Sequence, residues 1–162
     1  MTTPQYTRAQ LFQNRTFMTV RRAGLAADLA GGANFNVFTV AGPVQVQSII
    51  GVVTTIIGAG AAVPRISFTP TGGAAVHLCA APVSIALDAV GTIYVWDGTS
   101  VGALAPASQI GTADAGETSW VAGNITLVAG IIRITNAVVS SGIIDWYVSY
   151  LPLTPTALVT AL

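Results

Sequence analysis

Residues 45–64 read QVQSIIGVVTTIIGAGAAVP, a run of twenty residues without a charged side chain. The uncharged window is wider still, because no Asp, Glu, Lys or Arg occurs between Asp28 and Arg65. A membrane span, a buried core and a surface that other protein covers would each account for such a run. The residue types within the run favour the last two.

The run has the composition of β-strands. A helix that crosses a bilayer needs about 20 mainly apolar residues, and the run has that length. However, most of its large apolar residues are valine and isoleucine, whose branched side chains favour strands. Gln45 and Gln47 alternate with Val44 and Val46, which is a period of two rather than about 3.6. We expect two strands or one long bent strand, with Gly51 at a bulge or a close backbone approach, and no membrane insertion.

Short apolar segments separated by turn residues continue along the chain. Asp97-Gly98 is its strongest hairpin signal, residues 102–116 are expected to form a loop, and residues 22–30 are the best helix candidate. Besides the quoted run, the predicted strands are 16–20, 35–40, 65–69, 75–78, 83–87, 92–96, 125–128, 131–135 and 143–150. The predicted inward side chains of three of them are Ile66, Phe68, Ile132, Ile134, Ile144, Trp146, Val148 and Tyr150. About eight to ten short strands predict an all-β protein, and we expect an antiparallel, jelly-roll-like β-sandwich.

The content of charged residues is unusually low. They make up 7% of the 162 residues, where about 25% is usual for a soluble domain, and lysine is absent. The formal net charge is zero, which is poor for keeping a monomer in solution. We therefore expect one domain that packs against copies of itself or against another protein.

The few charges are unevenly distributed. The first 22 residues carry a net charge of +4 and the remaining 140 a net charge of −4. We expect residues 1–33 to form a basic, extended N-terminal arm with the short helix, and residues 34–162 to form the sandwich. Docking onto an acidic protein is favoured over a solvated tail or a nucleic-acid contact, because polar and aromatic residues interrupt the arginines. The predicted partner-binding residues are Arg8, Arg15, Arg21, Arg22, Phe12 and Phe17.

The sequence offers little for catalysis or metal binding. His77 and Cys79 would share a strand face, but structural zinc takes four ligands and no others are evident nearby. We expect a half-buried histidine and a buried cysteine there. Asp114 and Glu117 could bind calcium weakly, but a solvated loop is the favoured interpretation. We predict no enzymatic activity, no cofactor and no metal site.

The strand aromatic residues have two interpretations. They could form a platform on which sugar rings stack, but aromatic residues on strands more often belong to the core. The residues in question are Tyr94, Trp96, Trp120, Trp146, Tyr147 and Tyr150.

Five short phrases of the sequence together resemble a known group of proteins. They are GPVQVQSIIGVVTTII (42–57), SFTPTGG (67–73), HLCA (77–80), VGTIY (90–94) and the segment 142–153, which ends WYVSYLPL. Across about residues 35–153, the set resembles small structural proteins of tailed-bacteriophage virions, especially capsid decoration, or cement, proteins. The resemblance implies a β-rich body, no enzyme and no cofactor.

A function follows as an expectation. The chain would bind the outside of a phage head and bridge neighbouring capsid subunits as a homo-oligomer, and many decoration proteins are trimers. Its partners would be the major capsid protein and its own copies, with no nucleic acid and no membrane. The alternative is a tail, fibre or host-recognition β-module, for which an exposed Trp96 or Trp120 beside a groove would be expected.

Overall fold

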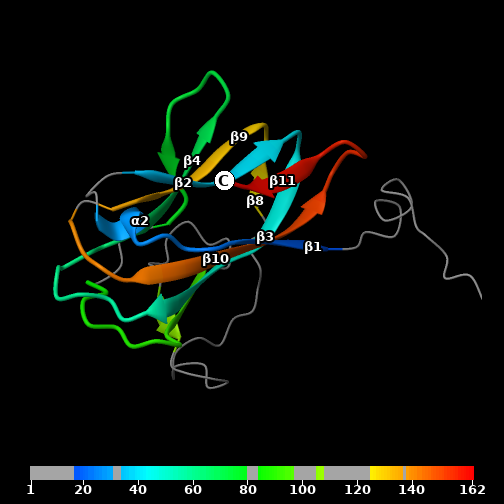
Figure 1. Ribbon diagram of the computed structural model, residues 1–162. Helices are drawn as coiled ribbons and strands as arrows, with labels where there is room; N and C mark the ends of the chain where they lie inside the picture. Colours follow the sequence, from blue (N-terminus) through cyan, green and yellow to red (C-terminus); the bar gives the residue numbers. More distant parts are fainter. Residues whose placement is uncertain (1–16, 31–33, 80–83, 97–104, 108–124, 137) are drawn as a thin grey trace, which may run out of the picture.

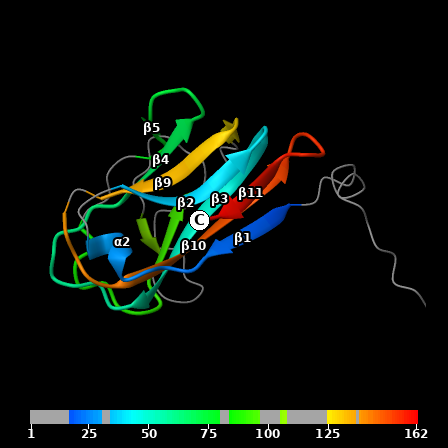
Figure 2. The same ribbon diagram turned by 45° about the horizontal axis from the view of Figure 1, so that its top comes forward.

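A computed structural model of the chain describes residues 17–30, 34–79, 84–96, 105–107, 125–136 and 138–162. These residues form two antiparallel sheets stacked face to face, with one short helix, α2 (Ala27–Ala30), at one end (Figure 1). The predicted all-β antiparallel sandwich is thereby confirmed. The same two layers are seen from a second direction in Figure 2.

Each sheet combines strands that are distant in the sequence. The six-stranded sheet has the order β1 (Met18–Arg22), β10 (Ile143–Pro152), β3 (Val44–Thr55), β6 (Ile93–Trp96), β7 (Ala105–Ala107), with β8 (Ile125–Leu127) also paired to β3. The five-stranded sheet has the order β11 (Leu158–Ala161), β2 (Phe35–Ala41), β9 (Gly130–Thr135), β4 (Arg65–Pro70), β5 (Val76–His77). Neighbouring strands in both sheets are antiparallel.

The uncharged run forms the central strand of the first sheet. Its first part lies in β3, a single strand of 12 residues that pairs with β10 on one side and with β6 and β8 on the other. Gly51 lies between Trp146 and Tyr94 of the neighbouring strands, and a Cβ atom there would be 2.8 Å from Cζ3 of Trp146. The predicted close approach at Gly51 is therefore confirmed.

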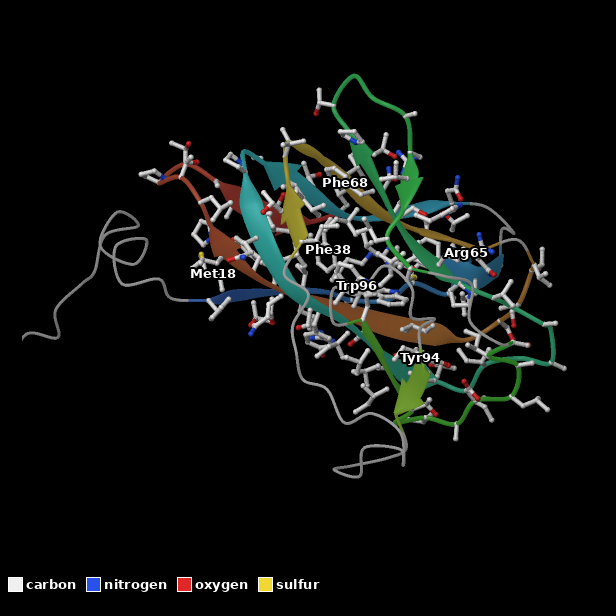
Figure 3. All side chains as sticks on the ribbon, turned by 180° about the vertical axis from the view of Figure 1, so that it is seen from behind. Met18, Phe38, Arg65, Phe68, Tyr94 and Trp96 are labelled. Carbon is white, nitrogen blue, oxygen red and sulfur yellow. The ribbon has the colours of Figure 1, made fainter. Side chains whose placement is uncertain are left out.

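The core fills the space between the sheets with alternate residues of each strand. Figure 3 shows Phe38, Phe68 and Trp96 in this space. The inward side chains predicted for three strands are confirmed, since all are buried: Ile66, Phe68, Ile132, Ile134, Ile144, Trp146, Val148 and Tyr150. Period-two alternation identified them because successive side chains of a strand point to opposite faces.

Several predicted elements differ from the structure. The described part of predicted strand 83–87 makes single hydrogen bonds from Ile85 N to the Ala62 oxygen and from Leu87 N to the Gly58 oxygen, and Leu87 has a φ of 67°. That φ value is incompatible with a strand. The helix is limited to one turn, and β7 lies within a predicted loop. Strand β11 was not predicted, and the predicted hairpin at Asp97-Gly98 lies outside the described residues.

The boundary between arm and body also differs. Strand β1 pairs with β10 over five residue pairs, from Met18–Tyr150 to Arg22–Trp146. Residues 18–22, which were expected in an arm outside the sandwich, therefore form an edge strand of its first sheet. Leu29 of the helix is buried in the core as well.

Candidate interaction surfaces

The two arginines of β1 point to opposite sides of the sheet. Arg21 lies opposite Tyr147 on the outer face, whereas Arg22 lies opposite Trp146 on the inner face. Adjacent residues of a strand must differ in this way. Figure 2 shows β1 running along β10 at the edge of the layer.

Arg22 is buried and forms its contacts within the chain. It is 5% exposed, and its guanidinium donates to both carboxylate oxygens of Asp28, with 2.9 Å from Nη2 to Oδ1. Its Nε donates to the backbone oxygen of Leu162 at 3.2 Å, and its Cζ lies 5.7 Å from the ring centre of Phe35. The prediction of Arg22 as a partner-binding cation is wrong, because the inward register of β1 uses it to tie helix α2 and strand β11 to the edge of the sheet.

Arg21 is exposed but paired. Its side chain is 58% exposed, and its Nη2 and Nε donate to Oδ2 of Asp145 at 2.6 and 3.1 Å. The hydrogen bond to Asp145 raises the pKa of Arg21. Burial raises the pKa of Asp145, but the amide of Gly24, which donates to Oδ1 at 2.8 Å, and the Arg21 guanidinium outweigh burial and hold this pKa below its usual range. Arg21 is reachable from outside, but its charge is matched within the chain.

The other predicted partner-binding residues have different outcomes. Phe17 is 48% exposed just before β1, where a partner could reach it. Arg8, Arg15 and Phe12 lie outside the described residues. Their role in docking stays a prediction.

All three acids that the structure describes are engaged by the chain itself. Asp28 pairs with Arg22, Asp145 pairs with Arg21, and Asp88 accepts a hydrogen bond from the hydroxyl of Tyr94. Burial and this hydrogen bond raise the pKa of Tyr94 above its usual range, so that the hydroxyl remains a donor. Within the described part, an arginine therefore neutralises two of the three carboxylates, and a neutral hydroxyl donates a hydrogen bond to the third.

The outer face of the six-stranded sheet is apolar at its centre. Across three adjacent strands, Tyr147, Ile50 and Val95 form one row of paired residues, and Val52 and Ile93 form part of the next. All five side chains are half-buried and point away from the core. We call this group the apolar face. Outer faces of antiparallel sheets are usually polar, so an apolar one indicates a surface that something covers.

A second apolar group adjoins it at the end of the sandwich near α2, on the left in Figure 1. The loops there are joined by hydrogen bonds from Gly58 N to the Ser141 oxygen and from Ile57 N to the Asp88 oxygen. Five large side chains of these loops are more than half exposed, and we call them the apolar end: Leu25, Ile56, Leu87, Val90 and Val139. Ile56 directly follows β3, and the exposed Thr54 and Thr55 lie between it and Val52 of the apolar face.

The sequence contained a signal for the apolar face that period-two analysis missed. Residues 49–53 are apolar or glycine at every position, so both faces of β3 are apolar there. A strand that is covered on both faces has such an unbroken apolar run. The run therefore serves both the core and the outer surface.

His77 and Cys79 do not form a reactive pair. His77 is exposed, in contrast to the half-buried side chain expected, and Cys79 is buried, as predicted. Burial raises the pKa of the Cys79 thiol, which disfavours the nucleophilic thiolate. His77 Nδ1 lies 2.9 Å from the Ser67 hydroxyl, but Ser67 is 1% exposed and its Oγ also lies 2.8 Å from Oγ1 of Thr135. A substrate could not reach that hydroxyl. Asp114 and Glu117 lie outside the described residues, and among the residues that the structure describes no three potential metal ligands of the His, Cys, Asp and Glu types are grouped.

The aromatic residues of the strands belong mainly to the core. Trp96, Trp146, Tyr94 and Tyr150 are buried, and Tyr147 is half-buried in the apolar face. Trp120 lies outside the described residues. Of the described platform residues, only Tyr147 therefore lies at the surface.

Comparisons of the chain with protein-family models, curated proteins and solved structures find no match. Among the described helices, none is long and apolar enough to cross a membrane. The functional inference therefore depends on the surfaces described above and on the short phrases of the sequence.

Proposed function

We propose that the chain is a structural protein of a phage virion, a decoration protein that binds the outside of the head as a homo-oligomer. The observation that carries the proposal is the apolar face, which lies on the outside of the sandwich beside side chains whose charges are already matched. Such a surface loses little on leaving water, because its five side chains carry no charge that would have to be desolvated. The phage context comes from the resemblance of the five phrases.

The size of the apolar face suits the core of an interface. Strands lie about 4.8 Å apart and outward residues of one strand about 6.8 Å apart, so the five side chains cover a patch on the order of 150 Å². A specific interface buries about 800 Å² on each partner, with an apolar core inside a polar rim. The apolar face would supply that core, and the apolar end and the neighbouring hydroxyl residues would supply the remainder. Several such contacts on one shell would act together through effective concentration.

The tail or host-recognition alternative predicted an exposed aromatic cluster. Trp96 is buried and donates its indole N–H to the backbone oxygen of Leu78 at 3.1 Å. No described residue therefore favours the alternative over the decoration protein.

The proposed contact between copies can be tested with a double variant. Ile50→Thr together with Val52→Thr makes the apolar face polar while retaining β-branched residues, which suit a strand. Ile131→Thr is the matched control, because Ile131 is a half-buried, outward-facing residue of the other sheet. In sedimentation velocity we expect an oligomer for the wild type and the control, and a shift towards monomer for the double variant. A monomeric wild type at all concentrations, or an oligomer unaffected by the double variant, would reject the apolar face as the contact.

The location needs a separate test. Purified virions of the phage that encodes the chain would be labelled with an antibody to it and imaged by electron microscopy. We expect label distributed over the head. Label confined to the tail or fibres would support the alternative module, and unlabelled virions would refute both.

A further inference from the structure

The outer face of the five-stranded sheet has the opposite character to the apolar face. Arg65 pairs with Thr135 across β4 and β9, and Ser67 pairs with both Arg133 and His77, so these residues occupy two adjacent rows. We call Arg65, Ser67, His77, Arg133 and Thr135 the basic face. Figure 3 shows Arg65 towards the end of the sandwich, away from Phe38 and Trp96 in the core.

No acid balances these two arginines among the described residues. The five strands of this sheet contain no Asp or Glu. The described acids lie in other elements, and two of them are already paired with Arg21 and Arg22. In contrast to those two arginines, neither Arg65 nor Arg133 forms a salt bridge with a described residue.

Two buried polar atoms in or next to the basic face have no hydrogen-bond partner among the described residues. Nε of Arg133 and Oγ1 of Thr69 are buried and make no hydrogen bond with described residues. Thr69 is two residues after Ser67 on β4, and the residue paired with Thr69 is Ile131, two residues before Arg133, so the two atoms belong to neighbouring outward positions. Buried polar groups of native proteins are nearly always hydrogen-bonded, and exceptions indicate a missing water, ion or partner.

We propose that the basic face binds an acidic protein segment in an extended conformation, with one carboxylate on Arg65 and one on Arg133. The two arginines occupy diagonal positions on adjacent strands, which lie about 7–8 Å apart. In an extended segment, alternate residues lie about 6.8 Å apart on one side. An Asp or Glu at every second position therefore matches the spacing of the two guanidiniums, which bind carboxylates through paired hydrogen bonds. The half-buried Thr135 lies in the same row as Arg65.

A protein segment fits this face better than a nucleic acid. Two arginines would neutralise about two phosphates, whereas nucleic-acid-binding proteins commonly neutralise six to ten. The chain has no lysine with which to extend the contact along a phosphate backbone. Under the proposed function, the acidic segment would belong to the capsid shell. Only the assignment of the acidic segment to the capsid rests on the proposed function, whereas the binding of an acidic segment does not.

The test uses the full chain and a synthetic peptide of eight residues that alternates Glu and Thr. Binding is followed by NMR through the Nε–Hε signals of the six arginines. We expect saturable shifts at Arg65 and Arg133, little change at Arg21 and Arg22, and no shifts with a peptide in which Gln replaces Glu. The double variant Arg65→Gln/Arg133→Gln should weaken binding about tenfold, while Ile131→Gln on the same sheet face should not.

Three results would overturn the proposal. They are the absence of shifts, equal shifts at all arginines, and tighter binding of an eight-residue oligothymidine than of the acidic peptide. Because the assay contains no virion, its failure is independent of whether the chain lies on the head. Conversely, virions that lack the chain would reject the proposed function and leave the peptide result unaffected.

Discussion

Replacement of Gly51 by alanine tests how tightly the central strand is packed. A Cβ atom at this position would lie 2.8 Å from Cζ3 and 3.0 Å from Cη2 of Trp146, and 3.1 Å from Cγ2 of Ile144. Trp146 is fully buried, so its indole has no room to move aside. Overpacking of this kind costs about 1–3 kcal/mol.

The sign of the effect distinguishes two explanations. Glycine within a strand is less favourable than alanine by roughly 0.5–1 kcal/mol, so backbone entropy alone predicts that Gly51→Ala stabilises the protein. Steric overlap predicts destabilisation. With a urea m-value of about 2 kcal/mol/M, the expected loss lowers the unfolding midpoint by about 0.5–1.5 M. Far-UV circular dichroism at one fixed protein concentration would measure it, since association shifts apparent stability.

The same substitution made in a Trp146→Phe protein identifies the atoms that overlap. Phenylalanine in place of Trp146 removes Cζ3 and Cη2 of the indole, so the cost of Gly51→Ala should be smaller in the Trp146→Phe protein than in the wild type. Residues in contact commonly show such coupling. A midpoint for Gly51→Ala at or above that of the wild type, or an equal cost in both backgrounds, would refute the packing argument.

Three further predictions concern polar groups of the sandwich. Arg22→Met should lower the free energy of unfolding by about 3–5 kcal/mol, because it leaves the carboxylate of Asp28 buried and unpaired, and urea titration should show a much smaller loss for the exposed Arg21. Folding lowers the pKa of Asp145, so its carboxylate stabilises the folded state above about pH 4, and this stabilisation is lost as the pH falls through the lower pKa of the folded state. The melting temperature of Asp145→Asn should therefore depend less on pH in that range than the melting temperature of the wild type. Tyr150→Phe should melt at or above the wild-type temperature, because the buried Tyr150 hydroxyl has no described hydrogen-bond partner, and a drop of several degrees would show that a partner exists.

Local pattern was sufficient for most of the strands and for the inward faces of three of them. In β4, β9 and β10 the alternation of apolar residues predicted which side chains the sandwich buries, because that alternation reflects the pleat of a single strand. The segment 83–87 has similar composition, but its backbone bonds to isolated residues of the 56–64 loop rather than to a neighbouring strand. The sequence of the segment does not reveal which distant residues its backbone will bond to.

The contacts of the basic residues could not be predicted from the local sequence pattern. The spacing of Arg21 and Arg22 shows that one must point inward, but the register of β1 against β10 decides which one, and that register joins residues more than 120 positions apart. Similarly, Arg65 and Arg133 both lie on the outer face of the five-stranded sheet. Their proximity depends on the pairing of β4 with β9, which only the fold reveals.

The neighbouring arginines of β1 have a consequence for how this edge strand finds its place. If β1 slipped by one residue along β10, one arginine would take the place of the other, and one acid would lose its cation: Asp28 for a slip in one direction and Asp145 for a slip in the other. Both salt bridges therefore form in only one alignment of β1 with β10. Replacing either arginine would leave the other to select the alignment, whereas replacing both would remove this selection.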